Sequence, residues 1–147
     1  NALIGLNATN VQGALEENAI RIGVLEKSDT VVYTAGQDLS GHRIVYADGN
    51  GEARYASNSI LTQAKMIIGM TTGAALAQDD VFIKRFGKFT EPSWNWYPGL
   101  SIFLGPNGTM TQIPPESPTA LFSLIIGFAI TSNRIFLDIS EPIALNF

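Results

Sequence analysis

Turn residues divide most of this chain into short segments that favour β-strands. The stretches "DGNG" (48–51), "GPNG" (105–108) and "SN" (132–133) each separate two runs rich in β-branched, aromatic or other apolar residues. Glycine and asparagine tolerate the positive φ angles that tight hairpin turns require. We therefore predict three β-hairpins, with strands over 43–47 and 52–56, 101–104 and 109–112, and 121–131 and 134–139. Further strands are expected over 31–34, 65–70 and 81–86, which makes residues 30–147 a small antiparallel β-sandwich or barrel domain.

The run "LFSLIIGFAI", residues 121–130, lacks the alternation of apolar and polar residues that a half-exposed strand shows. A strand with this composition is expected to be buried on both faces. In an antiparallel protein such a strand lies either inside a barrel or at an interface between subunits.

Residues 1–29 carry a different pattern, which is typical of a short coiled-coil helix. Thr9 and Gln12 fit a capping box at its start. The seam then follows at alternating spacings of four and three residues: Val11, Leu15, Asn18, Ile22 and Leu25. A single polar residue on such a seam fixes its register and the number of chains. We predict an oligomerising helical collar over residues 1–29. The alternative, a helix packed on its own domain, is favoured by Ile20 and Val24, which lie off the seam.

The composition also favours an oligomer. Charged residues make up 15% of the chain, against roughly 25% in an average soluble protein. Such a deficit is expected where part of the surface is buried against other chains. The net charge of −4 and the scattered Lys and Arg residues argue against a nucleic-acid partner.

Several other classes are excluded on simple grounds. Without cysteine, the chain has neither disulfides nor thiolate metal ligands. Its longest apolar run, residues 124–130, is far shorter than the ~20 residues of a membrane-spanning helix, so no membrane insertion is expected. Because the chain starts at Asn1 without an initiator methionine or a signal peptide, we expect it to be a fragment of a longer polypeptide that continues upstream.

No motif for catalysis, metal binding or cofactor binding stands out. The single histidine, His42, is expected at the start of a strand, since no nucleophile elbow accompanies it. Asp48, Asn50 and Glu52 alternate like the start of a calcium loop, but the later positions of that motif do not match, which leaves a hairpin turn. The acidic pair 79–80 is expected in a solvated turn. We therefore predict a protein that is not an enzyme and that uses no metal or cofactor.

The segment "EPSWNWYPG", residues 91–99, is the one candidate binding site. In a strand, Trp94 and Trp96 would face the same way and Tyr97 the opposite way, and paired aromatic rings can stack on sugars. The same residue types also anchor cores and subunit interfaces. Because Pro92 and Pro98 bracket the segment and restrict its path, a structural role is favoured over glycan stacking.

The stretch "NATNVQGALEENAIRI" resembles the linker helix, of the type T-N-V-Q-x-A-L-E-E-L, of bacteriophage tail-fibre and other virion fibre proteins. Asn18 stands where that helix often has an apolar residue. The remainder resembles a small β domain found at the ends of phage structural proteins, through "EPSWNWYPG", "LGPNGTMTQIPP" and "IFLDISEPIAL".

This resemblance implies a homotrimeric, non-enzymatic domain of a virion fibre, distal in the fibre and engaged in attachment to the bacterial host. Its partners would be two copies of itself, other virion proteins bound through the upstream part, and a glycan or protein of the bacterial surface. Three copies acting together would bind with avidity even through weak single sites.

Two alternatives remain open. One is a structural virion part without a receptor role, such as a capsid head fibre, a decoration protein or a connector. The other is a fibre-borne depolymerase, against which the lack of a carboxylate motif and of long repetitive β-helix strands argues.

Overall fold

The computed structural model of the protein describes residues 29–145. The predicted coiled-coil seam of Val11, Leu15, Asn18, Ile22 and Leu25 lies outside the described residues, as does the rest of the collar up to residue 28. The described part is mainly β, and all pairs between its strands are antiparallel. The predicted fold class is thus confirmed in its β-rich, antiparallel character.

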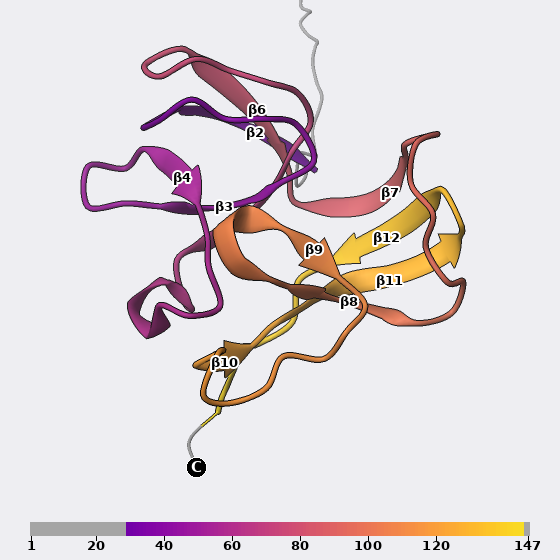
Figure 1. The fold of residues 1–147 in the computed structure, drawn as a ribbon. Helices are drawn as coiled ribbons and strands as arrows, with labels where there is room; N and C mark the ends of the chain where they lie inside the picture. The colour runs from indigo at the N-terminus through magenta and orange to yellow at the C-terminus, as the bar shows by residue number, and fades with distance from the viewer. Residues whose placement is uncertain (1–28, 146–147) are drawn as a thin grey trace, which may run out of the picture.

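Two five-stranded sheets form the body of the protein (Figure 1). The first sheet, in the order β2-β6-β5-β3-β4, contains β2 (Thr30–Thr34), β3 (Ile44–Ala47), β4 (Ala53–Tyr55), β5 (Ile67–Thr71) and β6 (Asp80–Lys84). The second sheet, in the order β7-β12-β11-β8-β9, contains β7 (Phe86–Thr90), β8 (Ser101–Leu104), β9 (Met110–Thr111), β11 (Ile125–Thr131) and β12 (Arg134–Asp138). A two-stranded sheet joins β10 (Phe122–Ser123) to β13 (Ile143–Ala144), and two short 3-10 turns cover Leu61–Gln63 and Pro106–Gly108.

The three predicted hairpins are confirmed as β3–β4, β8–β9 and β11–β12. In the first of them, the Asp48 carboxylate organises the turn. It accepts hydrogen bonds from the backbone N–H groups of Asn50 and Glu52, both at 2.9 Å, and from Nε of Arg54 at 2.8 Å. These bonds hold the pKa of Asp48 below its ordinary value, with the Glu52 N–H contributing most and Arg54 next. The alternating "DGNGE" residues therefore serve as a turn.

Two strand predictions were wrong because each joined residues that belong to different sheets. The strand expected over residues 121–131 is interrupted at Leu124, so that β10 and β11 belong to different sheets. The strand expected over 81–86 ends at Lys84: the Arg85 N–H still bonds the carbonyl of Asp29, at 2.6 Å, in the register of the β2–β6 pair, but Phe86 already pairs with Asp138 of β12. The chain passes there from the first sheet to β7 at the edge of the second.

The larger hydrophobic core lies between the two five-stranded sheets. Its fully buried side chains come from both sheets and from the adjoining segments: Ile44, Met70, Ile102, Leu104, Phe122, Leu124, Ile126, Ile135 and Leu137. A second core lies on the other face of the first sheet, around Val45, Val81 and Ile83. That sheet curls around it until its two edges meet, where Ala35 bridges to Ala53 and the Gly36 N–H bonds the Ala53 carbonyl at 2.8 Å.

Gly127 marks where β11 passes closest to β12. It is buried, and a Cβ atom at this position would overlap the carbonyl oxygen of Phe136 on the facing strand. The pairing of β11 with β8 shifts register between Ile125 and Gly127. A side chain at Gly127 would therefore push apart two strands at the centre of the second sheet.

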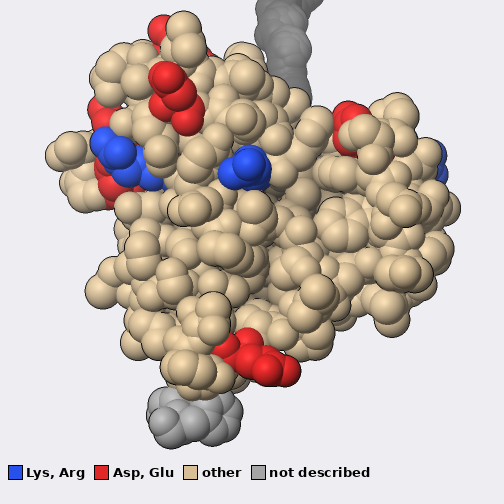
Figure 2. All heavy atoms as spheres, viewed as in Figure 1, with Lys and Arg blue, Asp and Glu red and all other residues tan. Residues whose placement is uncertain are grey.

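The described surface carries few charges over much of one face. In Figure 2 the charged side chains gather mainly around the first sheet, whereas the surface over β8 and β9 is almost free of them.

Candidate functional site

Trp94 and Trp96 lie in a loop between β7 and β8, so the strand geometry considered for them does not occur. The loop is fixed instead by hydrogen bonds to the β11–β12 hairpin. The Trp96 N–H donates to the Ser132 carbonyl at 2.8 Å, and the Gly99 N–H donates to the Ala129 carbonyl at 2.7 Å. The two rings nevertheless meet, with centroids 5.8 Å apart.

These rings belong to an aromatic cluster of His42, Phe89, Trp94 and Trp96. His42 stands edge-on to Phe89 at 5.3 Å and to Trp94 at 5.5 Å, and the rings of Phe89 and Trp94 are 5.9 Å apart. Phe89, Trp94 and Trp96 are partly buried and pack against the larger core. The cluster connects the first sheet, through the loop before β3, to the edge of the second. Its geometry is that of a packing element between the sheets, because the rings pack part of their surface against one another and against the larger core.

Trp96 has one unusual polar feature. Its Nε1–H is buried and finds no hydrogen-bond acceptor among residues 29–145. An unsatisfied buried donor costs about 1–3 kcal/mol of stability. The ring is therefore held by its apolar contacts alone.

His42 lies two residues before β3, close to the predicted position at a strand start, and adopts a φ of 61°. Its Nε2 lies 3.7 Å from Oε1 of Glu91. The pKa of Glu91 is held below its ordinary value, chiefly because the side-chain hydroxyl and the backbone N–H of Ser93 donate to it and to a smaller extent because of His42. A lowered pKa keeps Glu91 ionised at neutral pH, so that a carboxylate anion faces the His42 ring.

Tyr97 is separated from the aromatic cluster and points into solvent, with 72% of its surface exposed. Gln112 holds the backbone here. Its Oε1 accepts from the Tyr97 N–H at 2.9 Å, and its Nε2 donates to the Tyr97 carbonyl at 2.9 Å and to the Leu100 carbonyl at 3.3 Å. Leu100, whose carbonyl accepts one of these bonds, and Ile113, which follows Gln112 in the sequence, are also exposed. Tyr97 is thus the member of the three predicted site residues that is free to stack on a ligand.

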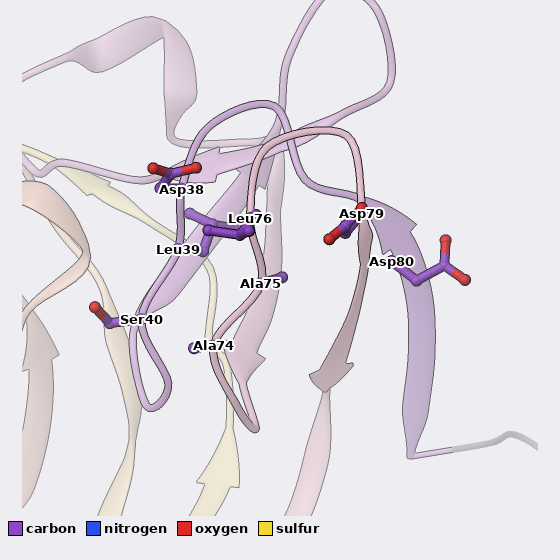
Figure 3. A pocket seen from close by; sticks show the side chains of 8 residues that line it. All are labelled: Asp38, Leu39, Ser40, Ala74, Ala75, Leu76, Asp79 and Asp80. Carbon is purple, nitrogen blue, oxygen red and sulfur yellow. The ribbon is translucent and has the colours of Figure 1, made fainter.

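An acidic pocket of about 380 Å³ lies at the end of the first sheet where β6 begins. It is lined by Asp38, Leu39, Ser40, Ala74, Ala75, Leu76, Asp79 and Asp80. Figure 3 shows that its carboxylates diverge, with Asp38 and Asp80 on opposite sides. The Asp38 carboxylate is already occupied by the N–H of Ala77 at 2.9 Å. Across residues 29–145, no three His, Asp or Glu side chains are grouped so that they could hold one metal ion. As predicted, the pair Asp79–Asp80 is solvent-exposed at the start of a strand.

A third feature, which the sequence interpretation missed, is an aromatic row on the outer side of the second sheet. Phe86 of β7, Phe136 of β12 and Phe128 of β11, which we call the phenylalanine face, follow one another across three strands. The ring centroids of Phe86 and Phe136 are 5.2 Å apart, and those of Phe128 and Phe136 are 5.6 Å apart. Phe86 is 49% exposed and Phe128 is 44% exposed. The missing alternation in "LFSLIIGFAI" was the available signal, since β11 supplies Phe128 outward and Ile126 and Ala129 inward.

Comparison with known proteins adds no assignment. No known family model matches the chain, and no curated protein sequence matches it. In the part of the chain that the structure describes, no helix has the length and apolar character needed to cross a membrane.

Proposed function

We propose that this chain is a non-enzymatic structural domain of a bacteriophage tail fibre, distal in the fibre, homotrimeric, and engaged in attachment to the bacterial host. Residues 1–29 act as the coiled-coil collar and the β domain over 30–147 follows it. Other virion proteins are its further partners, and neither nucleic acid nor membrane insertion is involved. The resemblance of the helix and of the closing β segments to virion fibre proteins motivates this proposal.

The phenylalanine face is the observation that carries it. An antiparallel sheet normally presents polar residues on the side away from its core. Here one outward position on each of three adjacent strands holds an aromatic ring, although the inward positions already supply the larger core. A cluster of aromatic rings on the outer side of a sheet fits a subunit of a larger assembly better than a free monomer.

Attachment would use Tyr97 rather than the two tryptophans. Trp94 and Trp96 are committed to packing on the larger core, whereas Tyr97 is exposed on a backbone fixed by Gln112. A rigid, exposed tyrosine suits stacking on a surface sugar. Each site would be weak, and three copies would supply avidity.

The packing of both tryptophans also favours the second candidate, a structural virion part without a receptor role, such as a capsid head fibre, a decoration protein or a connector. With Trp94 and Trp96 packed on the core, Tyr97 alone of the three predicted ligand-stacking residues remains available to a ligand.

Immunogold labelling of purified virions of the phage that encodes this chain tests the proposal. Antibodies against this chain should label the distal ends of tail fibres. Labelling of the capsid would support the second candidate, and unlabelled virions would refute both. Binding of the fluorescently tagged chain to host cells then tests attachment, with Tyr97→Ala expected to reduce binding and Ile143→Ala, another exposed position, expected to leave it unchanged.

A further inference from the structure

We propose that the phenylalanine face is an interface between copies of this chain, so that Phe86, Phe128 and Phe136 of one copy pack against a neighbouring copy of the β domain. This inference rests on the oligomeric fibre domain proposed above and deepens it, because it assigns the contact to a specific side of the second sheet.

The composition of the face suits a protein partner. The three rings form its centre, and the other outward residues of β7 and β12 surround them: Lys88, Thr90, Arg134 and Asp138. Phe136 lies opposite Lys88, and Phe86 lies opposite Asp138, in the pairing of β7 with β12. An apolar centre with a charged and polar rim is the usual anatomy of a protein–protein interface. Ser101 of β8 lies opposite Phe128 and extends the outward side beyond the rings.

The position of the face relative to the start of the described chain identifies a second copy as the occupant. The Asp29 carboxylate lies 3.0 Å from Nζ of Lys84, and the Asp29 carbonyl accepts from the Arg85 N–H. Phe86 follows directly and opens β7, the edge strand of the second sheet. Asp29 is therefore anchored beside Arg85, one residue before the first ring of the phenylalanine face.

The seam predicted for residues 11–25 would hold several copies parallel to one another around a common axis. Copies joined in this way have their Asp29 residues close to that axis. Each phenylalanine face is then presented to a neighbour without any further partner being needed.

The exposed area of three phenylalanines is well below the roughly 800 Å² per partner of a stable interface. The face thus forms the centre of a contact whose remaining area comes from its rim and from the collar. The low charge of the chain is consistent with such an extended contact.

Because the chain contains no cysteine, single cysteines can test this arrangement cleanly. The full chain with Phe128→Cys should give covalent pairs with a short bismaleimide cross-linker at dilute concentration. Leu76→Cys is the matched control. Leu76 is 66% exposed and lies in the loop before Asp80, at the opposite end of β6 from Lys84 and the Asp29 junction. It should give no pairs. Circular dichroism would establish that both variants keep their β structure.

A second variant separates the face from the collar. Phe86→Lys combined with Phe128→Lys should lower the oligomer mass or raise the concentration at which it forms by at least tenfold, whereas Leu76→Lys should not. An oligomer that is unchanged by the double substitution and gives no Phe128→Cys pairs would overturn the inference and leave the virion fibre proposal standing. Unlabelled virions in the immunogold experiment would refute that proposal independently of the cross-linking result.

Discussion

Replacing Trp96 by alanine distinguishes a packing role of the tryptophans from a ligand-binding role. Trp96 is mostly buried and packs against the larger core. Truncation of a fully buried tryptophan costs about 3–5 kcal/mol. Because part of this ring is solvent-exposed, we expect Trp96→Ala to lower the free energy of unfolding by about 2–4 kcal/mol.

Trp96→Phe is the control that isolates the indole nitrogen. This substitution removes some ring surface and also removes the buried Nε1–H, which has no acceptor among the described residues. Loss of an unsatisfied donor recovers about 1–3 kcal/mol, which offsets the lost packing. The free energy of unfolding of Trp96→Phe should therefore lie within about 1 kcal/mol of that of the original protein.

Urea denaturation followed by tryptophan fluorescence and circular dichroism measures both effects. All variants must be compared at one protein concentration, since the stability of an oligomer depends on it. With a urea dependence of about 1–3 kcal/mol per molar, the midpoint of Trp96→Ala should fall by about 1 M or more. A midpoint unchanged by Trp96→Ala, together with lost cell binding, would refute the packing role and return Trp96 to the binding site.

Three further predictions concern the fold. Gly127→Ala should destabilise the protein by about 1–3 kcal/mol through overlap with the facing strand, whereas Gly49→Ala, where a Cβ meets no atom within 4 Å, should change its thermal midpoint little. Thr71→Val should lower the free energy of unfolding, measured by urea denaturation, by about 1–3 kcal/mol. The buried Thr71 hydroxyl donates to the Ser40 carbonyl and accepts from the Arg43 N–H, and valine can do neither. The lowered pKa of Asp48 means that its contribution is complete at neutral pH and is lost as the pH falls below about 4 and through its folded-state pKa. The urea midpoint should therefore fall less between pH 7 and pH 3 in Asp48→Asn than in the original protein, and equal losses would contradict the role of this carboxylate in the turn.

The parts of the fold that could be predicted from the sequence depend on local chemistry. The three hairpins are formed by Gly- and Asn-bearing turns that lie between the strands they join. The strands on either side of Arg85 could not be separated in this way, because each is defined by its pairing with a distant strand, β6 with β2 and β7 with β12. The pairing of β10 with β13 is equally non-local.

The candidate site shows the same division. The prolines beside Trp94 and Trp96 indicated a fixed path, but the loop is held by the β11–β12 hairpin, whose position no local pattern gives. Periodicity alone also could not show that Phe86, Phe128 and Phe136 share one side of a sheet. Their alignment depends on the register of two strand pairs, which only the assembled sheet fixes.

The most direct test of assembly through the collar and the phenylalanine face is the solution mass of residues 1–147, measured by light scattering over a range of concentrations. The proposal predicts a mass three times that of one chain, maintained on dilution. A monomer at all concentrations would contradict it, and would show that the phenylalanine face does not bind a second copy of the chain.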